Sequence, residues 1–90
     1  MIKERTKPIE NTEDQTGESN YLILHNDDHN TFDFVIDTLI EVCDHDPITA
    51  EQLTLIVHYK GKCTVKSGDI DELEPMSREM TDRGLTVSIN

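Results

Sequence analysis

Large apolar side chains are sparse over residues 1–19 and recur regularly from Tyr21 onward. A segment with so few apolar residues buries too little surface to offset the entropy of ordering it, so we predict a flexible arm over residues 1–19. The regular part predicts one ordered domain over residues 20–90, because a chain of this length supports a single modest core.

The first half of the ordered part predicts a strand and then a helix. Residues 21–24 form a continuous apolar run, which is typical of a strand that is partly covered on both faces. A polar stretch follows, and Asn30 or Thr31 is suited to begin the helix as its N-cap. The helix is predicted from apolar residues at three- and four-residue spacing, which are Phe32, Val35, Ile36, Leu39, Ile40 and Cys43.

A second helix is predicted from about Ile48 to Tyr59. Pro47 breaks the preceding helix and suits the first turn of the next one, and Gly61 suits its C-terminal end. We expect this helix to bury Leu53, Ile56 and Val57, with Leu55 as a further candidate.

The last third predicts a strand, a helix and a strand. Residues 62–65 are a short strand candidate, and residues 67–68 a turn. Residues 70–83 have helical spacing, although Pro75 predicts a kink or a restart, and residues 85–89 alternate as in a half-buried strand. The predicted fold is therefore α+β in the order β-α-α-β-α-β, with helices on one face of a mostly antiparallel sheet.

The charge of the chain excludes some classes of partner. The formal net charge is −11, with 19 acidic against 8 basic residues, and no run of Lys or Arg exists. Binding of nucleic acid or of an anionic membrane needs clustered cations, so neither is expected, and a cationic partner is favoured. No apolar stretch approaches a membrane span or a signal-peptide core, and two cysteines are too few for a disulfide scaffold, so we expect a cytoplasmic protein.

The usual residues of catalysis are weakly represented. Cys43 falls on the apolar stripe of the first helix and Cys63 in a short strand, where a thiol usually acts as a small hydrophobe. The histidines and cysteines show no metal-ligand spacing, and no Gly-rich phosphate loop is present. We therefore expect no catalytic residue, no metal and no cofactor.

One set of polar residues has a possible binding function. Asn26, Asp27 and Asp28 follow the first strand, and His58 lies near the end of the second helix. These residues are either a polar turn with a surface histidine or a binding site for a cationic group, since amide, carboxylate and neutral imidazole all accept hydrogen bonds. Apolar residues next to them would suit an amine that carries an apolar side chain, as a protein N-terminus does.

Three segments resemble the ClpS adaptor family in order and spacing. They lie at residues 21–28, 32–39 and 57–62 and contain an Asn-Asp-Asp motif, a Phe-Val helix start and a His-x-x-Gly-Lys element. The resemblance covers roughly residues 20–89. It implies a fold similar to the C-terminal domain of the large ribosomal stalk protein, with an unstructured N-terminal arm.

The resemblance also implies a function without catalysis. ClpS adaptors bind proteins whose first residue is bulky and hydrophobic and deliver them to a Clp protease, so the expected partners are such N-degron substrates and the N-terminal domain of a Clp AAA+ unfoldase of the ClpA or ClpC type. A monomer is the expected state.

The site residues carry over by position. Asn26, Asp28 and His58 are expected to bind the α-ammonium of the substrate, and Asp27 to shape the loop and contact the start of the substrate. The expected pocket for the first side chain is lined by Leu24, Asn30, Phe32, Val35, Ile48, Thr54, Val57 and Leu85. The family often carries Met at the positions of Phe32 and Thr54, so the preferred first residue stays open.

Two alternatives remain at this stage. One is a docking regulator of the same fold that does not bind N-termini, and the other is a metal-dependent enzyme or zinc domain.

Overall fold

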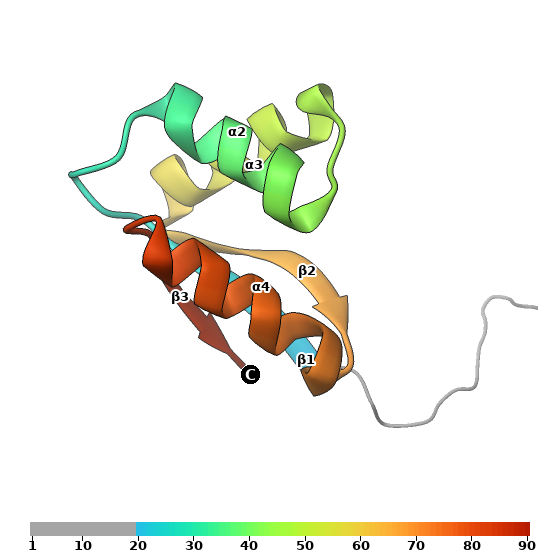
Figure 1. Cartoon of the computed structure of the whole chain (residues 1–90). Coiled ribbons are helices and arrows are strands. Elements are labelled where there is room, and N and C mark those ends of the chain that lie inside the picture. The colour runs from blue at the N-terminus through green and yellow to red at the C-terminus, as the bar shows by residue number, and fades with distance from the viewer. Residues whose placement is uncertain (1–19) are drawn as a thin grey trace, which may run out of the picture.

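The chain follows the predicted order of elements. The computed structural model describes residues 20–90, and the arm predicted over residues 1–19 lies outside them. The elements of this part are β1 (Asn20–His25), α2 (Phe32–Cys43), α3 (Pro47–Lys60), β2 (Lys62–Gly68), α4 (Ile70–Asp82) and β3 (Thr86–Ile89) (Figure 1). Three strands and three helices in the order β-α-α-β-α-β confirm the predicted α+β class.

β1 is the central strand of the sheet and pairs antiparallel with β2 on one side and with β3 on the other. This central place explains its continuous apolar run. Leu22 and Leu24 are 0% and 1% exposed and belong to the core that the helices cover. Ile23 points to the opposite face of the sheet, because side chains alternate along a strand, and is 9% exposed.

A β-bulge in β2 lies next to the residue that contacts the end of α2. The register of β1 with β2 shifts between Leu22 and Ile23, which leaves Val65 as an extra residue on the β2 side. The next residue, Lys66, donates from Nζ to the Cys43 carbonyl at 3.0 Å. Lys66 thereby satisfies one of the carbonyls that the last turn of a helix leaves without an intrahelical partner.

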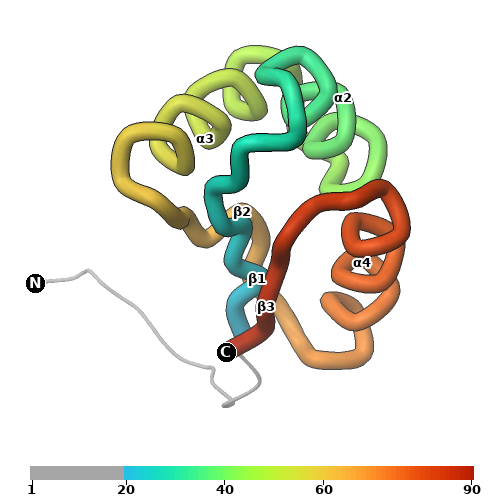
Figure 2. The backbone as a smooth tube through the Cα atoms, turned by 90° about the vertical axis from the view of Figure 1, so that its left-hand side faces the viewer, coloured from blue at the N-terminus to red at the C-terminus, as the bar shows by residue number. Residues whose placement is uncertain are grey.

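Buried side chains from the sheet and all three helices form one core. In Figure 2 the helices form an arc around the strands, from α3 through α2 to α4. α2 packs on α3, α3 contacts β2, and α4 packs on β3 and β1. The core consists of Leu22, Leu24, Leu39, Cys43, Ala50, Val57, Val65, Leu73, Met80 and Leu85.

The buried face of α3 differs from the predicted one. Val57 is buried and Leu53 partly buried, but Ile56 is 42% exposed. Ala50 and Thr54 complete the buried face instead. The apolar residues of α3 point to all sides of the helix, so their spacing does not select one face. Thr54 can be buried because its hydroxyl donates to the Ala50 carbonyl of the same helix at 2.8 Å.

One local prediction in the last third is wrong, and another is narrowed. The predicted turn at residues 67–68 is the end of β2, where Gly68 pairs with Asn20 in extended conformation. Of the kink or restart predicted at Pro75, the restart is absent, because α4 continues through that residue. Proline removes one bond to the carbonyl four residues earlier, and Asp71, which carries that carbonyl, lies in the exposed first turn of the helix.

Candidate functional site

A cavity of about 270 Å³ opens where several ends of elements meet. The end of β1 and the loop after it form one side, and the start of α2, the second half of α3 and the residue before β3 form the others. The lining residues are Leu24, His25, Asn26, Asp27, Asp28, Asn30, Thr31, Phe32, Val35, Thr54, Val57, His58 and Leu85.

Thr31 fixes the direction in which α2 leaves the loop. Its backbone is extended, and its Oγ1 accepts a hydrogen bond from the Phe34 backbone N–H at 3.1 Å, as an N-cap does. This confirms the predicted cap. Phe32 and Val35 then follow three residues apart on the helix face that borders the cavity.

Asp27 holds the loop between β1 and α2 in shape. Its Oδ1 accepts the backbone N–H of His29 at 2.9 Å and of Asn30 at 3.0 Å, and its Oδ2 accepts the Asn30 side-chain amide at 3.0 Å. Burial acts to raise the pKa of the Asp27 carboxyl, but the hydrogen bonds from His29 and Asn30 outweigh it and hold this pKa below its usual value. Asp27 is therefore a charged acceptor for donors of its own loop.

Asn30 links two sides of the cavity. Its side-chain Nδ2 donates to the Asp27 carboxylate and also to the Gly84 carbonyl at 3.0 Å. Gly84 immediately precedes Leu85, which lines the cavity and is 5% exposed. One amide group thus holds the loop after β1 against the connection between α4 and β3.

The mouth of the cavity carries acceptor groups that no described residue occupies. The side-chain hydrogen bonds of this loop within residues 20–90 involve Asp27, Asn30 and Thr31 but not Asn26 or Asp28. The Asn26 backbone N–H donates to the Gly61 carbonyl at 2.9 Å, which brings the loop to the end of α3, next to His58. Asn26, Asp28 and His58 are all exposed to solvent at this mouth.

Three aromatic rings line up beside the mouth. The Phe32 and His58 rings meet edge to face at a centroid distance of 5.1 Å, and the His58 and Tyr59 rings do so at the same distance. Phe32 holds the imidazole from the α2 side. The His58 ring therefore has a defined position between α2 and the end of α3.

The base of the cavity is apolar. Leu24, Val57 and Leu85 are each at most 5% exposed, and Thr54 is 3% exposed with its hydroxyl already bonded to the helix backbone. A site of this kind suits a molecule with a charged donor group at one end and an apolar body at the other. An ammonium has three N–H donors, which matches an amide oxygen, a carboxylate and a neutral imidazole at one mouth.

The structure brings together eleven of the twelve site residues expected from the sequence, all except Ile48. Ile48 lies in the first turn of α3, ten residues before His58, and a helix rises about 1.5 Å per residue, which places Ile48 roughly 15 Å away along the axis. It is 67% exposed and does not line the cavity.

His25 and Thr31 also line the cavity, although neither was among the site residues expected from the sequence. His25 lies between Leu24 and Asn26, and its Nε2 is hydrogen-bonded to Ser88 Oγ at 2.8 Å. Both residues lie next to predicted site residues, and this was the only signal that could have identified them. Side chains alternate along a strand, so His25 was expected on the face opposite to Leu24.

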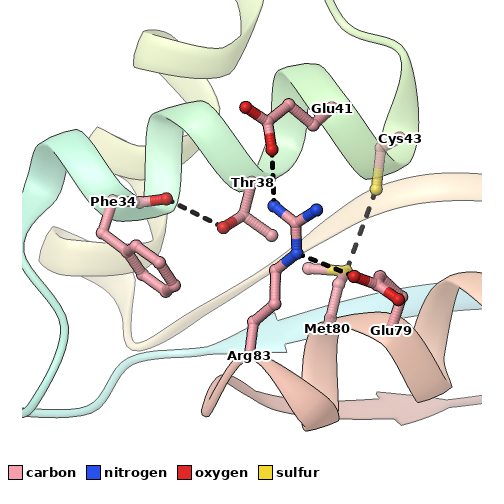
Figure 3. A network of polar contacts seen from close by, with 7 residues as sticks. All are labelled: Phe34, Thr38, Glu41, Cys43, Glu79, Met80 and Arg83. Carbon is pink, nitrogen blue, oxygen red and sulfur yellow. Dashed lines mark hydrogen bonds and ion pairs between the residues drawn. The ribbon is translucent and has the colours of Figure 1, made fainter.

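A polar network lies beside the connection from α4 to β3, which contributes Leu85 to the cavity (Figure 3). Arg83 donates from Nη1 to Glu41 Oε1 at 2.7 Å and from Nε to Glu79 Oε2 at 2.9 Å. These bonds connect α2 with the last turn of α4, directly before Gly84 and Leu85. Because the ion pairs are exposed to solvent, they orient this connection more than they stabilise the fold.

Among residues 20–90, the cysteines and acidic side chains show no arrangement typical of catalysis or metal binding. Burial raises the pKa of the Cys43 thiol to about 11 and also raises that of Cys63. Residues 20–90 contain no group of three His, Cys, Asp or Glu side chains placed to hold a metal ion. In the same range no helix is long and apolar enough to span a membrane.

Comparisons with known proteins agree on one family. The family model of the ATP-dependent Clp protease adaptor protein ClpS matches residues 15–88. The ClpS adapter protein of Nitratidesulfovibrio vulgaris is 42% identical over 53 residues, which cover 57% of this chain and 53% of that protein. The corresponding protein of Pectobacterium carotovorum is 43% identical over 53 residues, covering 57% and 50%. The chain thus spans about half the length of these curated relatives.

A solved structure supports the fold independently. The structure of Agrobacterium tumefaciens ClpS2 bound to L-phenylalaninamide superposes with a TM-score of 0.78 over 83% of this chain and 98% of that one, at 23% sequence identity. At this identity the likeness establishes the fold alone. Because the family model covers nearly all of the described residues and the fold agrees, this chain belongs to the ClpS family of Clp protease adaptor proteins.

Proposed function

We propose that this chain is an adaptor that binds proteins with a bulky hydrophobic first residue and delivers them to a Clp AAA+ unfoldase and its protease. The observation that carries the proposal is the cavity itself, which joins an apolar base to a mouth with three side-chain acceptors. A protein N-terminus carries a cationic donor and a side chain on the same carbon atom, so one small cavity can bind both.

The mouth binds the α-ammonium of the substrate. Asn26 and Asp28 offer side-chain oxygens, and His58 offers a ring nitrogen when it is neutral. Within residues 20–90 these groups have no competing side-chain hydrogen bond. Asp27 acts on this site through the loop, since its carboxylate is engaged by His29 and Asn30 and shapes the place where the substrate begins.

The apolar base binds the first side chain. Leu24, Val35, Val57 and Leu85 supply hydrocarbon, and Phe32 forms the outer wall. Burial of a Leu- or Phe-sized side chain is worth about 1.5–3 kcal/mol, which makes bulky first residues the preferred substrates. L-phenylalaninamide, the ligand of the Agrobacterium ClpS2 structure, has both features that this cavity requires, a free amine and a large apolar side chain.

The acceptors also explain why internal hydrophobic residues are rejected. A residue inside a chain has no ammonium, so binding it would bury the acceptors of Asn26, Asp28 and His58 unpaired. An unsatisfied buried group costs about 1–3 kcal/mol, and 1.4 kcal/mol is a factor of ten in affinity. Acetylation of the N-terminus removes the charge and is expected to have the same effect.

Delivery requires a second contact, with the N-terminal domain of a ClpA- or ClpC-type unfoldase. Membership in the adaptor family supports this part of the proposal. The chain then acts in the cytoplasm as a monomer and without catalysis of its own, and the segment 1–19 takes part in delivery.

The proposal is tested by fluorescence anisotropy with peptides that differ only at the first residue. Leu, Phe, Tyr, Trp, Ile, Met and Ala are compared, each with a free and an acetylated amine. We expect micromolar or tighter binding of the bulky residues, loss of at least tenfold in affinity on acetylation, and a similar loss in Asp28→Ala. Asp37→Ala is the matched control, because Asp37 is an exposed carboxylate on α2 that does not line the cavity.

Two results would contradict the proposal. Equal binding of free and acetylated peptides would exclude recognition of the ammonium. No binding of any peptide up to about millimolar concentration, the level of roughly 4 kcal/mol, combined with unfoldase binding that survives Asp28→Ala, would instead support a docking regulator.

A further inference from the structure

α3 is apolar on two opposite faces. One face is buried through Ala50, Thr54 and Val57. The other carries Ile48, Leu55, Ile56 and Tyr59, which are 67%, 37%, 42% and 79% exposed. Ile48, Leu55 and Tyr59 are spaced by seven and four residues, so they lie above one another on one side of the helix. We refer to these four side chains as the outer α3 stripe.

The outer α3 stripe is unusual for the surface of this domain. Eight large apolar side chains are well exposed among residues 20–90, and half of them belong to the stripe. A surface helix normally carries polar residues on the face away from the core. Leu55, Ile56 and Tyr59 form the denser part of the stripe, and the exposed Gln52 lies between them and Ile48 on the same side of the helix. A group of exposed apolar side chains on one face of a helix is typical of a binding surface.

The stripe begins at the mouth of the cavity. The Tyr59 ring contacts the His58 ring at 5.1 Å, and the same imidazole contacts Phe32 on the cavity wall. Leu55 lies one turn before Tyr59 on the same side of the helix. An apolar path therefore leads from the mouth of the cavity along the outside of α3.

A polypeptide held by its first residue must leave the cavity at this mouth. The carbon that carries the ammonium is also bonded to the first carbonyl, so residue 2 starts next to the groups that bind the amine. Ile48 and Tyr59 are eleven residues apart, or about 16 Å along the helix axis. An extended chain covers this distance with about five residues at roughly 3.3 Å each.

We propose that the outer α3 stripe binds apolar side chains at positions 2 to about 6 of the same polypeptide whose first residue occupies the cavity. This inference rests on the proposed function and adds a second specificity element to it. The substrates it selects have a bulky hydrophobic first residue followed by an extended segment that contains further apolar residues. A second copy of the chain is a poorer occupant, because it would cover Tyr59 and crowd the mouth beside His58.

The test compares three ligands by anisotropy or calorimetry. The first is the short ligand Phe-Gly-amide, the second a decapeptide with Phe first and Val, Leu or Ala at positions 2 to 6, and the third a decapeptide with Gly and Ser at those positions. We expect the apolar decapeptide to bind the wild-type chain on the order of tenfold more tightly than the Gly/Ser decapeptide. This ratio should fall to about one in the double variant Leu55→Ser with Ile56→Ser, which changes two exposed residues of the stripe that do not line the cavity.

Matched variants separate the stripe from general effects. Ile70→Ser changes an apolar residue of α4 that is 41% exposed, nearly the exposure of Ile56, and should keep the tenfold ratio. Ile48→Ser alone affects a residue of the stripe that is 67% exposed and does not line the cavity, and it should lower the ratio without loss of folding, as checked by thermal unfolding. Phe-Gly-amide should bind all four proteins equally.

The outcomes distinguish this inference from the proposed function. Equal affinity of the two decapeptides for the wild-type chain would overturn the inference, while binding of Phe-Gly-amide would leave the proposed function intact. Failure of Phe-Gly-amide to bind the wild-type chain would overturn the proposed function itself. Dimerisation in sedimentation that the double variant abolishes would also overturn the inference, since it would assign the stripe to a second copy.

Discussion

Adjacent polar residues of the loop after β1 differ in their hydrogen bonding and exposure. Asp27 and Asn30 bond to each other and to the backbone around the cavity, whereas Asn26 and Asp28 keep their side chains exposed at its mouth. The difference follows from geometry within the loop, since the Asp27 carboxylate accepts the backbone N–H groups of His29 and Asn30, two and three residues further on. Two asparagines four positions apart are therefore expected to respond differently to substitution.

Asn30→Ala should lower stability, and Asn26→Ala should lower peptide affinity. Removal of the Asn30 amide breaks its bonds to Asp27 and to the Gly84 carbonyl, so we expect a loss of about 1–2 kcal/mol in the free energy of unfolding. Asn26→Ala removes an exposed acceptor and should leave the free energy of unfolding within about 0.5 kcal/mol of the wild type. Urea denaturation and peptide anisotropy on both variants check this contrast, and equal destabilisation by the two substitutions would contradict it.

The ends of the helices position the site more than their middles do. Thr31 sets where α2 begins, and Lys66 bonds to its last turn. Gly61 ends α3 in the left-handed conformation with φ of 92°, and its carbonyl accepts the Asn26 backbone N–H at 2.9 Å. The end of α3 and the loop that carries the acceptors are thus joined through one residue.

Gly61→Ala should destabilise the chain and weaken ligand binding together. Space is not limiting, since a Cβ at this position would meet nothing within 4 Å, but the left-handed conformation costs a residue with a Cβ about 1–2 kcal/mol. Relief of this strain would move the Gly61 carbonyl away from Asn26. Urea denaturation and anisotropy measure the two effects, with Lys60→Ala as the neighbouring control, and an unchanged midpoint would exclude strain at this position.

At the scale of the whole molecule, the core and the cavity share residues. Leu24, Val57 and Leu85 belong to the hydrophobic core and also line the cavity. The cavity is therefore an opening in the edge of the core, and ligand binding should stabilise the folded chain by mass action. Cys43 lies deeper, with its Sγ 3.9 Å from Met80 Sδ and no exposed surface, between α2 and α4.

Cys43 should react with alkylating reagents only when the whole domain opens. Burial raises the pKa of this thiol to about 11, so the reactive thiolate is scarce below that pH in the folded state. Because an unfolded thiol ionises earlier, this group lowers stability as the pH rises from about 9 to 11. Mass spectrometry of iodoacetamide-treated protein at pH 8 should show Cys63 modified first and Cys43 only in denaturing urea; modification of both at one rate would indicate local opening of α2.

The sequence alone predicted the order of the elements, which the structure confirms. The resemblance to the ClpS family supplied twelve expected site residues, and eleven of them line the cavity. Apolar periodicity, Pro47 and Gly61 marked the helices because these signals act locally, within one turn. The sequence did not predict which face of α3 is buried, because its apolar residues point to all sides of the helix. Packing against α2 and β2 selects Ala50, Thr54 and Val57 as the buried face.

The tertiary structure also decided matters at the site itself. Residue types alone gave Asp27 and Asp28 the same chemistry, and the resemblance assigned them different roles. In the folded loop the Asp27 carboxylate is engaged, whereas Asp28 is exposed. Ile48 was placed in the pocket by resemblance, but the rise of α3 sets it far from the mouth. Local sequence fixes which residues a helix contains, whereas the packing of elements that are distant in the chain fixes which of them face one another.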